Sequence, residues 1–259
     1  MTGRQAHSQS DHAAIPTTIP PENRNSEHAD WLRAACDPAL TGDQALALLE
    51  RADLSADVIE QLAKNRSALK LRKVKFVLAC HAHTPRHVSI PLIRQFYTFD
   101  LMKVALSPTV LADIKLSADA TLISRLKTIT QGERSTLARR ASGKVAGALL
   151  LDAEERIMRA ALENARMTEA HIVQAILNPE ASAALVHAVS QHEKWCYRRD
   201  VQLALLLSEH LSLARALAFT CEMSLEQRAE ILQTSRLPET IKNQLLREIP
   251  HEKSPSSEK

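Results

Sequence analysis

Residues 130–178 read TQGERSTLARRASGKVAGALLLDAEERIMRAALENARMTEAHIVQAILN, a stretch that contains one short helical unit written twice. Residues 143–154 align with residues 155–166, and the apolar and capping positions coincide: Val145 with Ile157, Ala148 with Ala160, Leu150 with Leu162, and Asp152 with Asn164. Each copy carries an apolar stripe at helical spacing, then an Asp or Asn that can end one helix or cap the next. Because so short a helix cannot bury its stripe alone, the duplication predicts helices stacked on their neighbours, as in a solenoid.

The composition of the chain favours an all-α fold. Hydrophobic residues make up 45% of the 259 residues but aromatic residues only 3%, so the predicted core consists of Leu, Ala, Val and Ile. Only five glycines are present, and no run alternates β-branched and polar residues as a half-buried strand does. We therefore expect helices throughout the folded part.

Cysteine usage and hydropathy indicate a soluble protein of the cell interior. Cys36, Cys80, Cys196 and Cys221 are far apart in the chain, which favours reduced thiols over a disulfide framework or a metal site. The first residues lack the apolar segment of a signal peptide, and no apolar run approaches the roughly 20 residues that span a bilayer. We expect a cytoplasmic protein with no membrane partner and no cofactor.

The distribution of polar residues divides the chain into three parts. Residues 1–38 are rich in His, Ser, Pro and Asn, which predicts a disordered arm whose Trp31 and Leu32 dock on the first helices. Residues 39–249 form the predicted helical stack, and residues 250–259 a disordered polar tail.

Helix-start signals recur throughout residues 39–249. Four pairs have the spacing of a capping box: Thr41 with Gln44, Thr130 with Glu133, Asp152 with Glu155, and Ser224 with Gln227. Pro85, Pro108 and Pro179 each follow a capping residue, and proline costs least at the first helical position. The signals predict helices near 42–52, 56–65, 67–81, 85–96, 100–106, 108–129, 131–141, 143–151, 153–163, 168–177, 179–191, 198–208, 212–221, 225–234 and 238–248. Pro91 is expected to kink or split one of them.

The sequence VAGALLLDAEERIMRAALENARMTEAHIV at residues 145–173 resembles the short helical repeats of bacterial HEAT-like α-solenoids, including the leucine-rich-repeat-variant type. The segments LSLARALAF (211–219) and LPETIKNQLL (237–246) look like degenerate copies. The resemblance implies an all-α, right-handed HEAT-like α-solenoid of about seven helical pairs that serves as a binding scaffold. It implies no reaction and assigns no functional residue, because the matched positions are packing and capping positions.

The charge of the chain is unevenly distributed, although the formal net charge is only +3. Residues 64–144 contain sixteen Lys and Arg against four Asp and Glu, a balance of +12. Since a solenoid lays repeats side by side, these bases are expected to line one surface and attract phosphates or an acidic protein. The alternative is that bases interleaved with apolar residues, as in LKLRKVKFVL at 69–78, merely solvate the outer face.

The candidate partner-binding residues are the densest groups of bases: Lys70, Arg72, Lys73, Lys75, Arg134, Arg139, Arg140 and Lys144. Arg139 and Arg140 are adjacent on one predicted helix and must diverge by about 100°. We therefore hypothesise that at least one of them points into a groove and binds an anion, while the other packs or pairs internally. Any such groove is expected on the N-terminal side of residues 130–178.

Metal and catalytic signals are weak. Cys80, His81, His83 and His87 are the only cluster with metal-ligand atoms, but their loose spacing favours ordinary histidines over a site. No nucleophile elbow, phosphate-binding glycine loop or zinc-protease motif is present. Some HEAT-like folds are DNA glycosylases, and Asp100, beside Phe96, Tyr97 and Phe99, is the best catalytic candidate; Phe76 and these three aromatics are otherwise expected in the core.

Three functions remain open from the sequence. The first is a non-catalytic intracellular scaffold that presents a basic solenoid surface, built by the first half of the repeats, to an acidic protein partner. The second is a nucleic-acid-binding protein that uses the same bases for phosphate contacts. The third is a glycosylase-like or lyase-like enzyme on the same fold.

Overall fold

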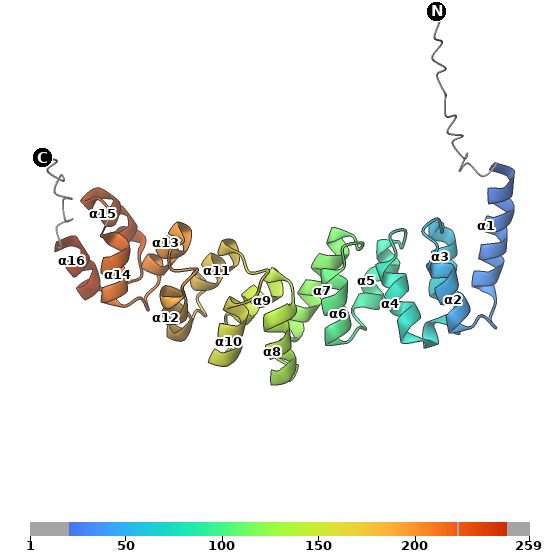
Figure 1. The fold of residues 1–259 in the computed structure, drawn as a ribbon, viewed down its shortest axis with the longest axis horizontal. Coiled ribbons are helices and arrows are strands. Elements are labelled where there is room, and N and C mark those ends of the chain that lie inside the picture. Colours follow the sequence, from blue (N-terminus) through green and yellow to red (C-terminus); the bar gives the residue numbers. More distant parts are fainter. Residues whose placement is uncertain (1–20, 222, 248–259) are drawn as a thin grey trace, which may run out of the picture. The chain divides into compact units, whose positions relative to one another are not determined.

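The computed structural model of the protein describes residues 21–221 and 223–247, and all regular structure in these residues is helical (Figure 1). The chain divides into two compact units. The first contains the residues up to Leu78 together with 83–85, and the second contains residues 79–82 and those from Arg86 onward. The prediction of an all-α fold with successive helices packed on their neighbours is confirmed, while its right-handedness stays a prediction.

The first unit begins with a helix where the sequence suggested disorder. Its elements are α1 (Pro21–Cys36), α2 (Gly42–Leu49), α3 (Ala56–Lys64), the 3-10 helix η1 (Ala68–Lys70) and α4 (Arg72–Cys80), of which the residues up to Leu78 belong to this unit. Helix α1 packs on α3, buries Ala35 and half-buries Trp31 and Leu32. The Arg51 guanidinium lies 4.3 Å from the centre of the Trp31 ring.

The prediction of a disordered arm is therefore wrong for residues 21–36, although the docking of Trp31 and Leu32 is confirmed. The polar composition of this segment obscured a short apolar stripe. Trp31 and Ala35 are one helical turn apart and therefore lie on the same side of α1. Residues 1–20 and the predicted tail at 250–259 lie outside the described residues.

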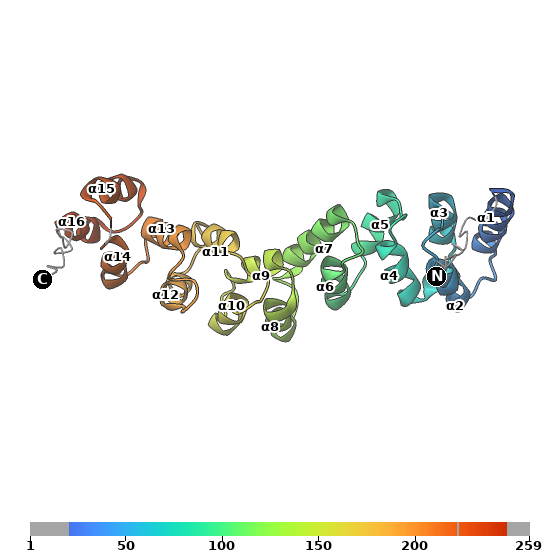
Figure 2. The same ribbon diagram turned by 45° about the horizontal axis from the view of Figure 1, so that its top comes forward.

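The second unit consists of short helices that pack in two rows (Figure 1 and Figure 2). The helices are α5 (Arg86–Ile93), α6 (Thr98–Leu106), α7 (Ala112–Arg125), α8 (Gln131–Arg140), α9 (Gly143–Leu149), α10 (Glu155–Leu162), α11 (Glu169–Ile176), α12 (Ala183–Gln191), α13 (Arg199–Leu207), α14 (Leu213–Thr220), α15 (Leu225–Thr234) and α16 (Glu239–Arg247). Most of them pack on the helix two places along: α5, α7, α9, α11, α13 and α15 form one row, and α8, α10 and α12 belong to the other. The twelve-residue sequence repeat thus describes one helix, and the structural repeat contains two.

Most of the predicted helix starts are correct. Capping boxes are present at Thr41, Thr130 and Ser224. The fourth prediction is wrong, because Glu154 precedes α10 and the Asp152 carboxylate instead accepts a hydrogen bond from the Glu154 N–H. Pro108 and Pro179 precede turns rather than opening helices, since α7 begins at Ala112 and α12 at Ala183.

Pro91 lies inside α5 without splitting it, because the helix ends only two residues later, at Ile93. The predicted helix at 67–81 is divided into η1 and α4 at Leu71, whose backbone is extended.

Helix ends in this structure are closed by side chains from the following repeat. No described residue has a positive φ, so none of these helices ends in the left-handed turn that commonly satisfies the last carbonyl groups. Donors arrive instead from some 20 to 35 residues further along the chain: Asn65 Nδ2 to Ala35 O (3.0 Å), Asn164 Nδ2 to Ala138 O (2.8 Å), Trp195 Nε1 to Leu162 O (3.3 Å) and Ser235 Oγ to Leu206 O (2.6 Å). These bonds fix each helix to the equivalent helix of the next repeat.

Asn164 makes three side-chain hydrogen bonds, because its Nδ2 also donates to Ala141 O and its Oδ1 accepts from the Arg166 N–H. Replacing Asn164 by Ala should cost about 1–3 kcal/mol, since buried carbonyl groups lose their donor. The free energy of unfolding in urea measures this cost. Asn178→Ala, which removes one local bond to Glu180 N–H, is the matched control and should cost less; equal losses would contradict the inter-repeat role.

Gly143 marks a close approach between α9 and the segment before α11. A Cβ built there would lie 2.2 Å from Arg166 O and 2.7 Å from His171 Cε1, whereas a Cβ at Gly132 on α8 meets nothing within 4 Å. Gly143→Ala should therefore destabilise the fold by about 1–3 kcal/mol. Gly132→Ala should stabilise it by about 0.5–1 kcal/mol, because alanine restricts the unfolded chain. Thermal unfolding of the two variants compares them directly, and a tolerated Gly143→Ala would refute the close packing.

Candidate anion-binding groove

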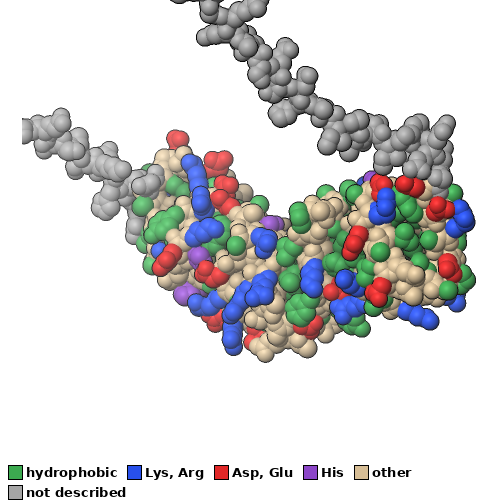
Figure 3. Space-filling view, turned by 45° about the vertical axis from the view of Figure 1, so that its right-hand side comes forward, with side chains coloured by type: hydrophobic (Ala, Val, Ile, Leu, Met, Phe, Trp, Pro, Cys, Tyr) green, Lys and Arg blue, Asp and Glu red, His purple; other side chains and the backbone are tan. Residues whose placement is uncertain are grey.

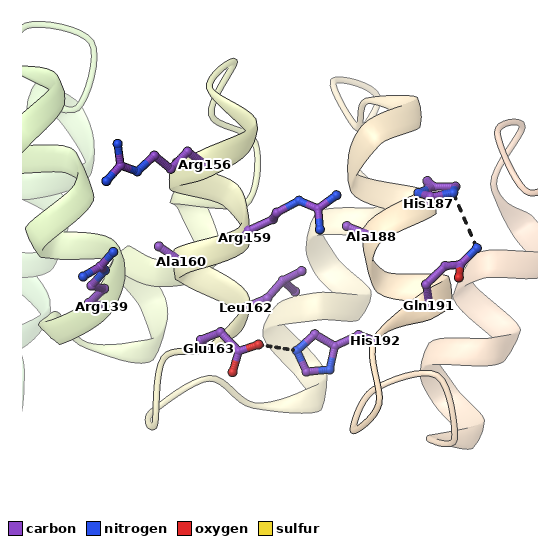
Figure 4. A pocket seen from close by; sticks show the side chains of 10 residues that line it. All are labelled: Arg139, Arg156, Arg159, Ala160, Leu162, Glu163, His187, Ala188, Gln191 and His192. Atoms are coloured by element: carbon purple, nitrogen blue, oxygen red, sulfur yellow. Dashed lines mark hydrogen bonds and ion pairs between the residues drawn. The ribbon is translucent and has the colours of Figure 1, made fainter.

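A groove of about 800 Å³ crosses α8, α10 and α12 in the second unit (Figure 4). Its lining residues are Arg139, Arg156, Arg159, Ala160, Leu162, Glu163, His187, Ala188, Gln191 and His192. Three of these side chains are guanidinium groups and one is a carboxylate. The lining is therefore cationic, and its floor is made of small or buried apolar side chains.

Regular helix geometry places the polar side chains of the groove. Arg139 lies in the last turn of α8. Arg156 and Arg159 are three residues apart on α10, and His187 and Gln191 are four apart on α12, so both pairs occupy neighbouring positions on exposed helix surface. Ile157, Met158 and Ala161 carry the buried face of α10 and fix its rotation.

The three arginines do not share one position. In Figure 4 the Arg139 and Arg156 side chains lie on the α8 side of α10, whereas Arg159 extends toward α12 and His187. In the described part of the chain, neither Arg139 nor Arg156 has an ion pair, and both side chains are exposed. These two guanidinium groups consequently keep their hydrogen-bonding capacity for a ligand.

The remaining charges of the groove are paired on the surface. Arg159 Nη2 lies 2.6 Å from Glu155 Oε1, and both side chains are more than half exposed. His192 Nε2 lies 3.1 Å from Glu163 Oε1 across α12 and α10. Because both partners of the Arg159–Glu155 pair are exposed, that pair contributes only about 0–1 kcal/mol, and an incoming anion can replace Glu155 at low cost.

Of the predicted binding residues in the second unit, only Arg139 lines the groove. Arg134 is half-buried and pairs with Asp152, whose carboxylate lies 2.8 Å away. Arg140 and Lys144 are exposed outside the groove. Arg139 thus lines a groove, as one member of the adjacent pair was expected to do, but the expectation that the other arginine packs or pairs internally is wrong, because Arg140 is exposed.

The other predicted residues belong to the first unit, where Lys70, Arg72 and Lys73 are exposed and Lys75 is half-buried. Bases of the second unit are partly consumed by internal contacts, because Arg86 pairs with Asp113 and Arg125 donates to Phe96 O and Arg94 O. On the face seen in Figure 3, Lys and Arg side chains are accordingly interspersed with Asp and Glu.

Sequence reasoning missed Arg156, Arg159 and His187, and it placed the groove too early in the chain. The expected position was N-terminal to the repeat stretch, but the groove spans residues 139–192. The repeat length could have predicted which helices are neighbours. Helices of one row are two twelve-residue units apart, so the helix that contains Arg139, α8, is expected to lie beside α10. Counting charge along the sequence hid this relation, because Glu154, Glu155 and Glu163 made that segment look acidic.

The histidine cluster forms no metal site, since no group of three His, Cys, Asp or Glu among the described residues is arranged to hold a metal ion. The four cysteines form no disulfide with one another; Cys36 and Cys221 are exposed, Cys80 is half-buried and Cys196 is buried. Burial, with a smaller effect of the Asp100 charge, raises the pKa of Cys80 to about 11, which leaves that thiol protonated at neutral pH.

The aromatic prediction is only partly correct. Phe96 is buried and Phe76 half-buried, but Tyr97 is 68% exposed and Phe99 41% exposed, so those two are not core residues. Asp100 is buried on α6. An acid enclosed beside exposed aromatics offers no groove in which a base could be bound, and the glycosylase-type arrangement gains no support.

Asp119, Ser142 and His171 have the residue types of a catalytic triad and come from or cap α7, α9 and α11. Their hydrogen bonds are nevertheless structural. Ser142 Oγ donates to Asp119 Oδ1 at 2.7 Å and accepts from the Val145 N–H as the cap of α9. His171 Nδ1 bonds Thr168 Oγ1 at 2.9 Å. The hydroxyl is thus directed at the carboxylate and not at the imidazole, contrary to triad geometry.

Comparison of the chain with protein-family models, curated proteins and solved structures gave no match. None of the described helices is both long and apolar enough to cross a membrane.

The Asp119 cluster makes stability depend on pH. Burial raises the pKa of this carboxyl above its ordinary value of 3.8, although Ser142, Lys144 and His171 act in the opposite direction. Because the folded-state pKa is raised, the ionised carboxyl opposes folding at neutral pH, and this cost disappears as the pH falls to the unfolded value. Asp119→Asn, which can still accept from Ser142, should therefore be at least as stable as the parent at neutral pH.

The difference between Asp119→Asn and the parent should shrink toward about pH 4, where the parent carboxyl becomes protonated. Urea unfolding at both pH values measures it. Asp113→Asn on the same helix is the control, because its carboxylate pairs with Arg86 and its removal should not stabilise the protein. A less stable Asp119→Asn at neutral pH would contradict the assigned direction.

Proposed function

We propose that this protein is a non-catalytic scaffold that binds an acidic segment of a protein partner in the groove across α8, α10 and α12. The observation that carries the proposal is the pair of exposed, unpaired guanidinium groups of Arg139 and Arg156 in that groove. A stack of helices that presents charge without a reactive constellation is suited to binding. A HEAT-like relationship, a right-handed stack and a cytoplasmic location are parts of the same proposal.

The lining favours a protein partner over nucleic acid. None of the ten lining residues is Phe, Tyr or Trp, and the only rings in the lining are the imidazoles of His187 and His192, so the groove lacks the large aromatic side chains on which successive bases stack. Glu163 within the groove and Glu155 beside it would also repel a continuous phosphate backbone, whereas a peptide can carry isolated acidic groups. Nucleic-acid binding remains the alternative, since exposed Tyr97 and Phe99 could stack bases elsewhere in the second unit.

The exposed bases of the first unit, Lys70, Arg72 and Lys73, provide a second contact for the same partner in this proposal. They are secondary because none of them lines the groove, and exposed lysines on a helix surface hold ligands weakly.

Reversing the charge at both groove arginines tests the function. The double variant Arg139→Glu, Arg156→Glu should lose at least about tenfold in affinity for partners captured from an acidic-peptide library, because attraction becomes repulsion at the contact. Fluorescence anisotropy measures the dissociation constants. Unchanged circular dichroism is expected, since both side chains are exposed.

The double variant Arg198→Glu, Arg199→Glu at the start of α13 is the matched control, an equal charge change at two exposed residues outside the lining of the groove. It should bind like the parent protein. If the control and the groove variant lost affinity equally, binding would follow net charge and the groove would not be the site. A salt dependence as steep as that of phosphate-backbone binding would favour the nucleic-acid alternative.

A further inference from the structure

The groove contains two cationic positions in adjacent gaps between helices. Arg139 and Arg156 occupy the gap between α8 and α10, and Arg159 with His187 occupies the gap between α10 and α12 (Figure 4). Ala160 is half-buried, and Leu162 and Ala188 are buried, so side chains between the two positions scarcely protrude. A ligand can therefore lie across α10 and reach both positions.

Helix packing sets the distance between the two positions. Helices in contact have axes about 8–10 Å apart, and α10 contacts both α8 and α12. A peptide in the extended polyproline II conformation advances about 3.1 Å per residue and returns to the same face every third residue, so two side chains that reach adjacent gaps are roughly three residues apart. A single small anion fills only one gap.

The two cationic positions differ in whether their arginines already have an ion pair. Arg139 and Arg156 have no ion pair in the described residues, whereas Arg159 is held by Glu155 at 2.6 Å. The first acidic group of a ligand meets two unengaged guanidinium groups, and the second must replace the Glu155 carboxylate. Affinity therefore depends mainly on the first position, and selectivity on the second.

Resting on the proposed function, we propose that the groove recognises an extended peptide segment carrying two acidic side chains about three residues apart. One carboxylate binds Arg139 and Arg156, and the other binds Arg159 in exchange for Glu155. The segment crosses α10 with its intervening residues against Ala160 and Ala188, which favours small side chains there.

Labelled Gly/Ser peptides test the spacing directly. One series carries a single Asp, and others carry two Asp residues that are adjacent, about three apart or about six apart. Fluorescence anisotropy with the full chain should show the three-residue spacing binding about tenfold more tightly than the single Asp. The adjacent pair and the six-residue spacing should gain much less.

Three variants separate the two positions. Arg159→Glu should abolish the advantage of the second Asp while leaving single-Asp binding unchanged, and Arg139→Glu should weaken every peptide about tenfold. Glu155→Gln, which releases Arg159, should strengthen only the peptides with two Asp residues at the favoured spacing. Arg199→Glu alone serves as the control for the two single arginine variants.

The outcomes distinguish this inference from the function on which it rests. If all two-Asp peptides bound equally and Arg139→Glu weakened them, the spacing rule would be overturned and the scaffold function kept. If Arg159→Glu weakened the single-Asp peptide as much as Arg139→Glu does, the two-position division would be overturned. If no peptide bound the parent protein while a single-stranded oligonucleotide did, both proposals would fall.

Discussion

The structure depends on how its short helices dispose of their last carbonyl groups. A helix of seven to ten residues, the length of most in the second unit, leaves four such groups without an intrahelical partner. With five glycines in the chain and no positive φ among the described residues, the usual left-handed closure is not used in that part of the protein. Side chains from the next repeat supply the donors instead, as Asn164 does for Ala138 and Ala141. Each repeat is therefore completed by its successor.

The same constraint decides which arginines are available for binding. Arg125, Arg215 and Arg228 donate to backbone carbonyl groups near helix ends, and Arg134 pairs with Asp152. A guanidinium group bonded in this way keeps its charge but is fixed in direction, so it stabilises the helix stack and cannot turn toward a ligand. Arg139 and Arg156 are exceptions because their stretches of α8 and α10 face open solvent in the groove. The proposed binding surface is therefore formed by arginines that do not serve to close helix ends.

Local sequence signals predicted most helices well, but they did not predict which charged side chains would lie close together. Thr41, Thr130 and Ser224 cap their helices as expected, because a capping box needs only residues within one turn. Asp152 does not cap α10, because Glu154 directly precedes that helix, and its carboxylate also pairs with Arg134, eighteen positions earlier. Helix α1 was missed because it has few apolar residues and packs on α3, which lies further along the chain. Neither the ion pair nor this packing can be predicted from neighbouring residues alone.

The sequence by itself determined the class of fold, the existence and approximate ends of most of its helices, and the residue types at several of their caps, since these follow from periodicity and neighbours within four positions. It also identified Arg139 as one of two adjacent arginines that had to diverge. Only the tertiary structure decided which of the two enters a groove and joined it to Arg156, Arg159 and His187. The reason is that successive helices of one row begin about 24 to 31 residues apart in the chain, so charges that look separate in sequence become neighbours only when the helices of a row stack.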